Sequence, residues 1–157
     1  MLELLVLVIV ANSAPVLARH LCGARFAVPV DGGRMHRDGR PLLGSSKTWR
    51  GLAAGLLATP LVALLLGIEA VLGLATGALA LGGDLAASFA KRRRGYVASA
   101  RAPLLDTLPE ALLPAAVLRE AYAIDWLEVG VVTAAFHVIV RASSPLLFRL
   151  GLRRRPW

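Results

Sequence analysis

Cysteine, aromatic residues and charged residues are all scarce in this chain of 157 residues, and each shortage excludes a class of protein. Cys22 is the only cysteine, so the chain can form neither an internal disulfide nor a thiolate metal cluster. Aromatic residues make up 6% of the sequence and are rarely interleaved with basic ones, which argues against nucleic-acid binding. Charged residues make up 18%, too few for the surface of an ordinary soluble domain.

Apolar residues are abundant instead, at 57% of the chain with a mean hydropathy of +0.65. Some apolar runs are shorter than the ~20 residues that a spanning helix needs, but each can be extended through small neighbours. We therefore predict an all-α integral membrane protein with about five transmembrane helices, organised as one membrane-embedded domain over residues 1–157. The apolar runs are Leu4–Leu17, Leu52–Leu66, Val71–Leu81, Leu104–Leu118 and Trp126–Phe148.

The charges are divided between alternate ends of these runs. Most of the 18 basic residues lie in Arg19–Arg50, Lys91–Arg101 and Arg149–Arg155. The other ends carry Glu3, Glu69, Glu120, Asp125 and Glu128. Short loops rich in Lys and Arg stay on the cytoplasmic side, so the pattern predicts a multi-pass protein of the cell (inner) membrane with its N-terminus outside and its C-terminus cytoplasmic. Topology and anionic headgroups account for most of these bases.

The first basic segment also has the composition of an anion site. Gly32 and Gly33 let the backbone approach a ligand, and Lys47, Thr48 and Arg50 lie where a helix begins. A helix N-terminus with free N–H groups and adjacent bases binds phosphate readily. The alternative is an ordinary cytoplasmic loop with turns set by its Pro, Asp and Gly residues. We favour phosphate binding.

An acid, a hydroxyl and a base share one face at the end of the third apolar run. On a helix, Asp84, Ser88 and Lys91 are separated by four and three residues, which aligns them. The alternative is a local ion pair between Asp84 and Lys91 or Arg92. A carboxylate in a membrane segment is costly and is generally functional, so we favour a functional site.

A second carboxylate, Asp106, is expected at the same depth near the cytoplasmic face. Two carboxylates beside a phosphate-binding loop suit Mg²⁺, which takes oxygen ligands from one or two acids and from substrate phosphates. Glu110, one turn further along, is a possible third ligand. Asn12 and His137 are expected within spans, where structural and functional roles are equally well supported. The terminal Arg153–Trp157 is expected to anchor the chain at the interface.

Several of these segments, in this order, resemble the CDP-archaeol synthase family, which is related to the phosphatidate cytidylyltransferases. The resemblance covers nearly the whole chain, and the Lys-Thr-Trp-Arg-Gly and Gly-Asp…Ser…Lys-Arg-Arg blocks are specific. The matching segments are Asn12–Val16, Pro29–Arg34, Gly44–Gly51, Gly83–Arg93, Leu105–Asp106 and His137–Trp157.

The resemblance implies a five-span enzyme that transfers CMP from CTP to a lipid phosphate, uses Mg²⁺ and releases pyrophosphate. It implies a reaction centre at Asp84, Ser88, Lys91 and Arg92, with metal ligands at Asp84 and Asp106. It implies substrate binding by Asn12, Asp31, Gly32, Gly33, Arg34, Lys47, Thr48, Arg50 and Gly51.

Some positions depart from the family pattern. Pro109 stands where the family usually has a second acid, and Arg141 and Ala142 lie where an Asn usually follows the last histidine. Two alternatives therefore stay open: a non-catalytic membrane scaffold that retains the fold, and a small transporter subunit. Because the polar residues gather at one set of helix ends rather than at mid-membrane, transport is disfavoured. A diacylglycerol or isoprenoid phosphate is an alternative acceptor.

Overall fold

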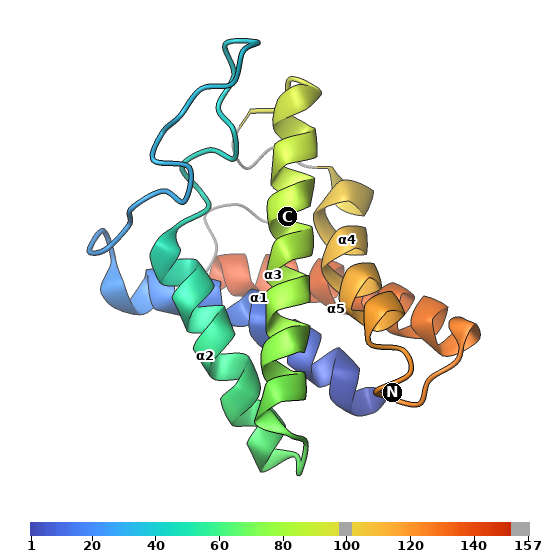
Figure 1. Cartoon of the computed structure of the whole chain (residues 1–157). Coiled ribbons are helices and arrows are strands. Elements are labelled where there is room, and N and C mark those ends of the chain that lie inside the picture. Colours follow the sequence, from blue (N-terminus) through green and yellow to red (C-terminus); the bar gives the residue numbers. More distant parts are fainter. Residues whose placement is uncertain (98–101, 152–157) are drawn as a thin grey trace.

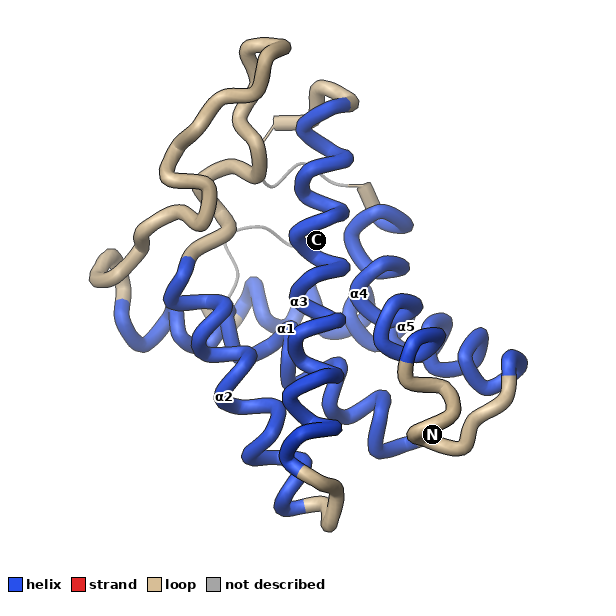
Figure 2. Tube along the Cα trace, in the orientation of Figure 1, coloured by secondary structure: helices blue, strands red, loops and turns tan. Residues whose placement is uncertain are grey.

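The structure is a computed structural model that describes residues 1–97 and 102–151 (Figures 1 and 2). The described residues form helices joined by turns and loops, so the predicted all-α class is confirmed. The expected anchor at Arg153–Trp157 lies outside the described residues. The helices are α1 (Leu2–Cys22), α2 (Trp49–Leu65), α3 (Ala70–Arg93), α4 (Pro103–Val117) and α5 (Trp126–Arg149).

Helix lengths separate the five elements into two groups. Helices α1, α3 and α5 have 21, 24 and 24 residues and are long and apolar enough to cross a membrane. Helices α2 and α4 have 17 and 15 residues. The exposed surface carries many large apolar side chains, as expected of a protein that faces lipid. The structure is thus that of a membrane protein, and the count of five spans stays a prediction.

Helix α3 extends well beyond the expected run, from Ala70 to Arg93. The helix passes through Gly82 and Gly83 and carries Asp84, Ser88 and Lys91, as the sequence predicted. Gly83 is needed for contact with α4: a Cβ built there would lie 2.1 Å from the Pro109 carbonyl oxygen. The absence of a side chain at Gly83 therefore lets the backbones of α3 and α4 meet beside Asp84.

Small residues also set the packing of α3 on α2. A Cβ built at Gly73 would lie 2.4 Å from the Ala63 side chain, and one at Gly77 would lie 2.9 Å from the Thr59 hydroxyl. A separate apolar core joins α1, α4 and α5 around the fully buried Phe136. Helix α3 thus stands between α2 and α4 (Figure 1), and its C-terminal end reaches the long loop of residues 23–48.

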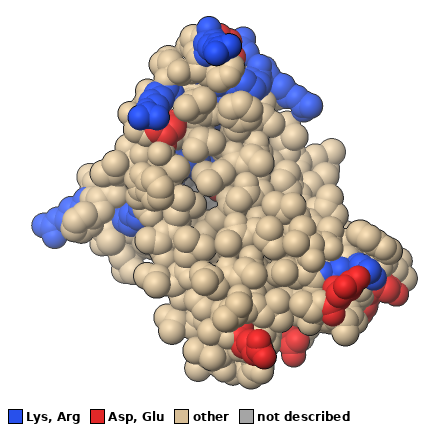
Figure 3. Space-filling view, viewed as in Figure 1, with Lys and Arg blue, Asp and Glu red and all other residues tan. Residues whose placement is uncertain are grey.

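The charges lie at opposite ends of the molecule. Figure 3 shows most of the visible Lys and Arg side chains gathered over the end that carries the 23–48 loop, and most of the visible Asp and Glu side chains at the other end, with a few charges of opposite sign at each. This is the division read from the sequence. The polar residues with expected functions lie at or near the basic end.

Candidate active site

Asp31 organises the long loop before α2. Its carboxylate accepts backbone N–H groups from Gly33 at 3.0 Å, and from Leu43 and Gly44 at 2.9 Å each. Burial alone would raise the pKa of Asp31, but the donors from Gly44, Leu43 and Gly33 outweigh it and hold the pKa below its usual value. The Asp31 side chain therefore joins the beginning of the loop to the segment at Leu43 and Gly44, which is more than ten residues further along the chain.

Replacing Asp31 with Asn should loosen this loop. One amide oxygen cannot serve three N–H donors, so we expect Asp31→Asn to lose about 1–3 kcal/mol of loop stability. Because the folded-state pKa lies below the ordinary value of 3.8, the stabilisation is complete above that pH and is lost as the pH falls through the lowered value. Melting temperatures of the purified proteins, measured from pH 7 to pH 3, should be lower for the variant than for wild type. This difference should narrow only below about pH 4. A variant matching wild type at pH 7 would contradict this role.

The end of the same loop delivers Lys47 to the acid on α3. Pro29 and Thr48 form an antiparallel bridge, and the Thr48 hydroxyl caps α2 by accepting the Gly51 N–H at 3.2 Å. Lys47 then extends to Asp84, with its Nζ 2.6 and 2.5 Å from the two carboxylate oxygens. Burial lowers the pKa of Lys47, but the Asp84 carboxylate outweighs burial and raises it. Lys47 is therefore a cation at neutral pH.

Two further groups complete a charged cluster between α3 and α4. Lys91, which is 7% exposed, donates to the Asp106 carboxylate, and Asp106 also accepts the Ala102 N–H at 2.9 Å. The Glu110 carboxyl group lies near Asp84 across the close contact at Gly83, and the two groups interact electrostatically. Two lysines and three acids thus lie together at the basic end, although none of the described residues form a group of three or more ligands placed to hold a metal ion.

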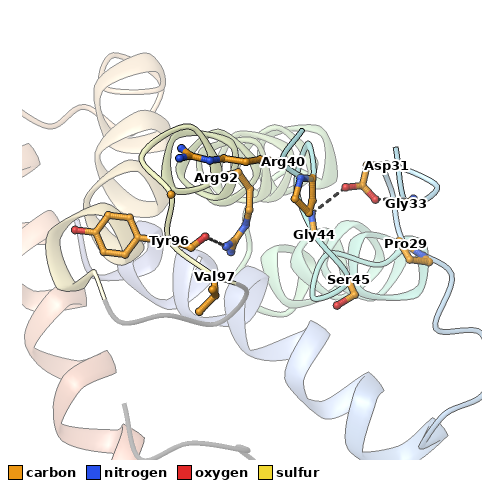
Figure 4. Close-up of a pocket in the computed structure, with 11 residues that line it drawn as sticks. Pro29, Asp31, Gly33, Arg40, Gly44, Ser45, Arg92, Tyr96 and Val97 are labelled. Atoms are coloured by element: carbon orange, nitrogen blue, oxygen red, sulfur yellow. Dashed lines mark hydrogen bonds between the residues drawn. The ribbon is translucent and has the colours of Figure 1, made fainter. Parts of the chain in front are cut away.

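A cavity of about 450 Å³ lies between the 23–48 loop and the end of α3 (Figure 4). Arg92, 4% exposed, lies in its wall and donates to the carbonyls of Leu43 and Tyr96. Arg92 also interacts electrostatically with Asp106, which links the cavity to the cluster. Other lining residues are Asp31, Gly33, Arg40, Gly44 and Ser45. The cavity size is typical of a site for a small organic ligand.

The remaining expected residues divide into those near the cavity and those away from it. Gly32 and Arg34 line a second hollow of about 590 Å³, which shares Asp31 with the first. Ser88 is buried on the same face of α3 as Asp84 and Lys91. Arg50 donates to the carbonyls of Gly23 and Arg25 just after α1.

Two residues bond within or between helices instead. The Asn12 amide donates to the Val8 carbonyl one turn earlier in α1, at 3.0 Å. The His137 ring in α5 contacts the Thr107 hydroxyl in α4 at 2.5 Å, which joins the two helices. Gly51 faces α1, where a Cβ would lie 3.2 Å from the Pro15 side chain.

Arg40 and Ser45 line the cavity but do not stand out in the sequence. One lies among several basic residues of the loop and the other beside a second serine, so composition does not distinguish them. Their placement depends on the loop closure that Asp31 provides. Sequence reasoning had no signal for that closure, because the backbone donors come from ordinary glycine and leucine residues.

Comparison with known proteins shows which family this chain belongs to. A family model described as CarS-like, CDP-archaeol synthase, matches residues 1–75. The CDP-archaeol synthase of Hyperthermus butylicus is 36% identical over 94% of this chain and 89% of its own length, and that of Aeropyrum pernix is 38% identical over 94% and 86%. A solved structure of an intramembrane enzyme for archaeal membrane lipid biosynthesis is 35% identical, with a TM-score of 0.68 over 90% of this chain and 92% of that one. The chain belongs to the CDP-archaeol synthase family.

Proposed function

We propose that this protein transfers CMP from CTP to a lipid phosphate of the archaeol type, forming a CDP-lipid and pyrophosphate. The observation that carries the proposal is the Lys47–Asp84 and Lys91–Asp106 cluster beside a nucleotide-sized cavity at the basic end of the helices. A scaffold without activity has no need of five ionisable groups held together in a membrane protein, because buried charges are costly.

The cavity and the cluster suit the two parts of a nucleoside triphosphate. The cavity would take the nucleoside, with Arg92 and Arg40 in its wall. The phosphates would extend toward Lys47 and Lys91, whose present partners are carboxylates. Phosphate oxygens can replace a carboxylate as the partner of a lysine, since both are anions that accept from its ammonium group.

The reaction is a direct displacement at phosphorus. An oxygen of the lipid phosphate attacks the α-phosphorus of CTP, the bond from that phosphorus to the oxygen bridging to the β-phosphate breaks, and pyrophosphate leaves. Lys47 and Lys91 would neutralise the charge on the departing group, and Arg92 would orient the nucleotide. Most of the catalysis then comes from positioning and charge stabilisation.

The acids present fit a magnesium ion. Mg²⁺ commonly uses one or two carboxylates and completes its shell with substrate phosphates and water. Asp84 and Asp106 would hold it, and Glu110, which lies near Asp84, would be an additional oxygen ligand. When bound, the ion would supply positive charge to the phosphate oxygens. Lys47 and Lys91 would move from the acids to the phosphates at that point.

The orientation follows from the charges. The basic end would face the cytoplasm, where CTP is found, with the N-terminus outside and the C-terminus inside the cell membrane. A lipid phosphate beside α3 or α4 would reach the cluster with its tails still in the bilayer. The exposed apolar surface of these helices supports this arrangement.

A product assay tests the proposed function. Membranes containing the protein are given radiolabelled CTP and, in turn, archaeol-type, diacylglycerol and isoprenoid phosphates, with and without Mg²⁺. We expect a labelled CDP-lipid with the archaeol-type acceptor, formed only with Mg²⁺. Efficient transfer to a different lipid phosphate would show that the acceptor is not of the archaeol type. If no acceptor supports CTP consumption, the proposed function is refuted.

A further inference from the structure

A pair of arginines fastens the tip of the long loop to the end of α3. The loop tip is a short hairpin closed by a bridge between Met35 and Pro41. From the helix, Arg93 donates to the Asp38 carboxylate and to the carbonyls of Pro41 at 2.6 Å and Arg40 at 3.4 Å. The Arg93 guanidinium also lies over the Phe89 ring, 5.1 Å from its centroid.

The contact is reciprocal. From the loop, Arg40 donates to the Arg93 carbonyl at 2.8 Å. Its guanidinium packs on Gly95, where a Cβ would lie 3.3–3.4 Å from three of its atoms. A cation at the C-terminal end of a helix is also favoured by the helix dipole. Each arginine thus binds the backbone of the segment that carries the other.

These contacts of Arg93 and Arg40 between the hairpin and the end of α3, which we call the latch, close one side of the cavity. Arg40 and Pro41, which Arg93 holds, line the cavity, and Arg92, next to Arg93, lines it from α3. Single surface ion pairs contribute little, but a planar guanidinium that bonds a carboxylate and two carbonyls at once fixes both position and direction. Without Arg93, the hairpin would lose the bonds to Asp38, Arg40 and Pro41 and would be held here by Arg40, which bonds the backbone of residue 93.

We propose that Arg93 is a positioning residue that preorganises the nucleotide pocket by holding the Asp38–Pro41 hairpin against α3. This inference depends on the proposed function, since it assigns the cavity to the nucleotide. Arg93 need not touch CTP. Binding of the lipid phosphate should not depend on the latch. A pocket whose wall must be ordered on binding costs affinity for its ligand, so the effect should fall on CTP.

The test is steady-state kinetics of Arg93→Ala with both substrates varied. We expect KM for CTP to rise about ten-fold, as for one lost charge-assisted hydrogen bond, with kcat and the KM for the lipid phosphate nearly unchanged. Arg93→Lys keeps the charge but not the planar guanidinium with its several N–H donors. It should therefore restore only part of the lost affinity for CTP. Arg94→Ala removes the neighbouring exposed cation and is the matched control. An unchanged KM for CTP in Arg93→Ala, or equal effects in Arg94→Ala, would overturn the latch.

A variant from the loop side guards against misfolding. Asp38→Ala removes an acceptor of Arg93 without altering α3. Asp38 also accepts the Arg40 N–H within the hairpin, so the double variant should lose less than the sum of the two single losses, because one contact is shared. Trypsin provides a readout independent of turnover, since Arg37 is exposed in the hairpin. Faster cleavage there in both single variants supports the latch, and equal rates in all proteins refute it. If the wild-type protein consumes no CTP, the proposed function is refuted. The rate of trypsin cleavage would still show whether Arg93 holds the hairpin against α3.

Discussion

Asp84→Asn should abolish CTP-dependent formation of a CDP-lipid, with a loss of about 1,000-fold or more. The substitution keeps the shape of the side chain and removes its charge. Asp84 is the acid that Lys47 and Glu110 both contact, so the change removes the common partner of the loop and of α4. It would also remove a proposed magnesium ligand. The measurement is labelled CDP-lipid formed per mole of purified enzyme.

Folding must be separated from chemistry in this experiment, because an unpaired Lys47 is itself destabilising. Size-exclusion profiles and melting midpoints in detergent provide that check. Glu69→Gln is the matched control, since Glu69 is an exposed acid at the other end of α3 and makes no side-chain cap. Normal turnover by well-folded Asp84→Asn would remove Asp84 from the reaction centre.

Gly83→Ala should have the second largest effect, although it adds only a methyl group. Its Cβ would lie 2.1 Å from the Pro109 carbonyl oxygen and 3.0 Å from the Glu110 nitrogen, and backbone cannot rotate away as a side chain can. Helices α3 and α4 would have to separate, which should cost about 1–3 kcal/mol. Because the acids on these two helices would then part, we also expect a loss of about 100-fold in activity.

The neighbouring glycine provides a close control. A Cβ built at Gly82 meets nothing within 4 Å, so Gly82→Ala should leave activity intact and leave stability unchanged or slightly improved. The two variants are compared by melting midpoint and by CDP-lipid formation. If both alanines behave alike, the close approach of α3 to α4 at Gly83 does not support the site.

Much of this fold can be predicted from the sequence, because apolar runs of suitable length and the separation of charges are local signals. The five runs appear as five helices, and Thr48 caps α2 where the helix start was expected. The resemblance to the CDP-archaeol synthases is confirmed by relatives at 36–38% identity, as is the class of CTP-using cytidylyltransferase. The assigned roles of the individual site residues stay predictions.

Contacts between distant segments could not be predicted in the same way. Helical spacing left open a local ion pair of Asp84 with Lys91 or Arg92. In the structure Asp84 instead pairs with Lys47 from the loop, and Lys91 pairs with Asp106. Arg50 has the position of a phosphate ligand in the sequence, yet its guanidinium binds carbonyls after α1. The close approach of α3 to α4 at Gly83 also had no sequence signal, because it depends on the Pro109 backbone of another helix.

The short fourth helix has a consequence for the surrounding bilayer. With 15 residues, α4 is about 22 Å long, less than the ~30 Å of a hydrocarbon layer, whereas the 24 residues of α3 extend for about 36 Å. Hydrophobic mismatch of this kind draws the lipid surface inward next to the shorter element. If α4 crosses the bilayer as predicted, a lipid headgroup beside it would lie deeper than its neighbours, so that membrane thickness would influence how easily the lipid meets the nucleotide.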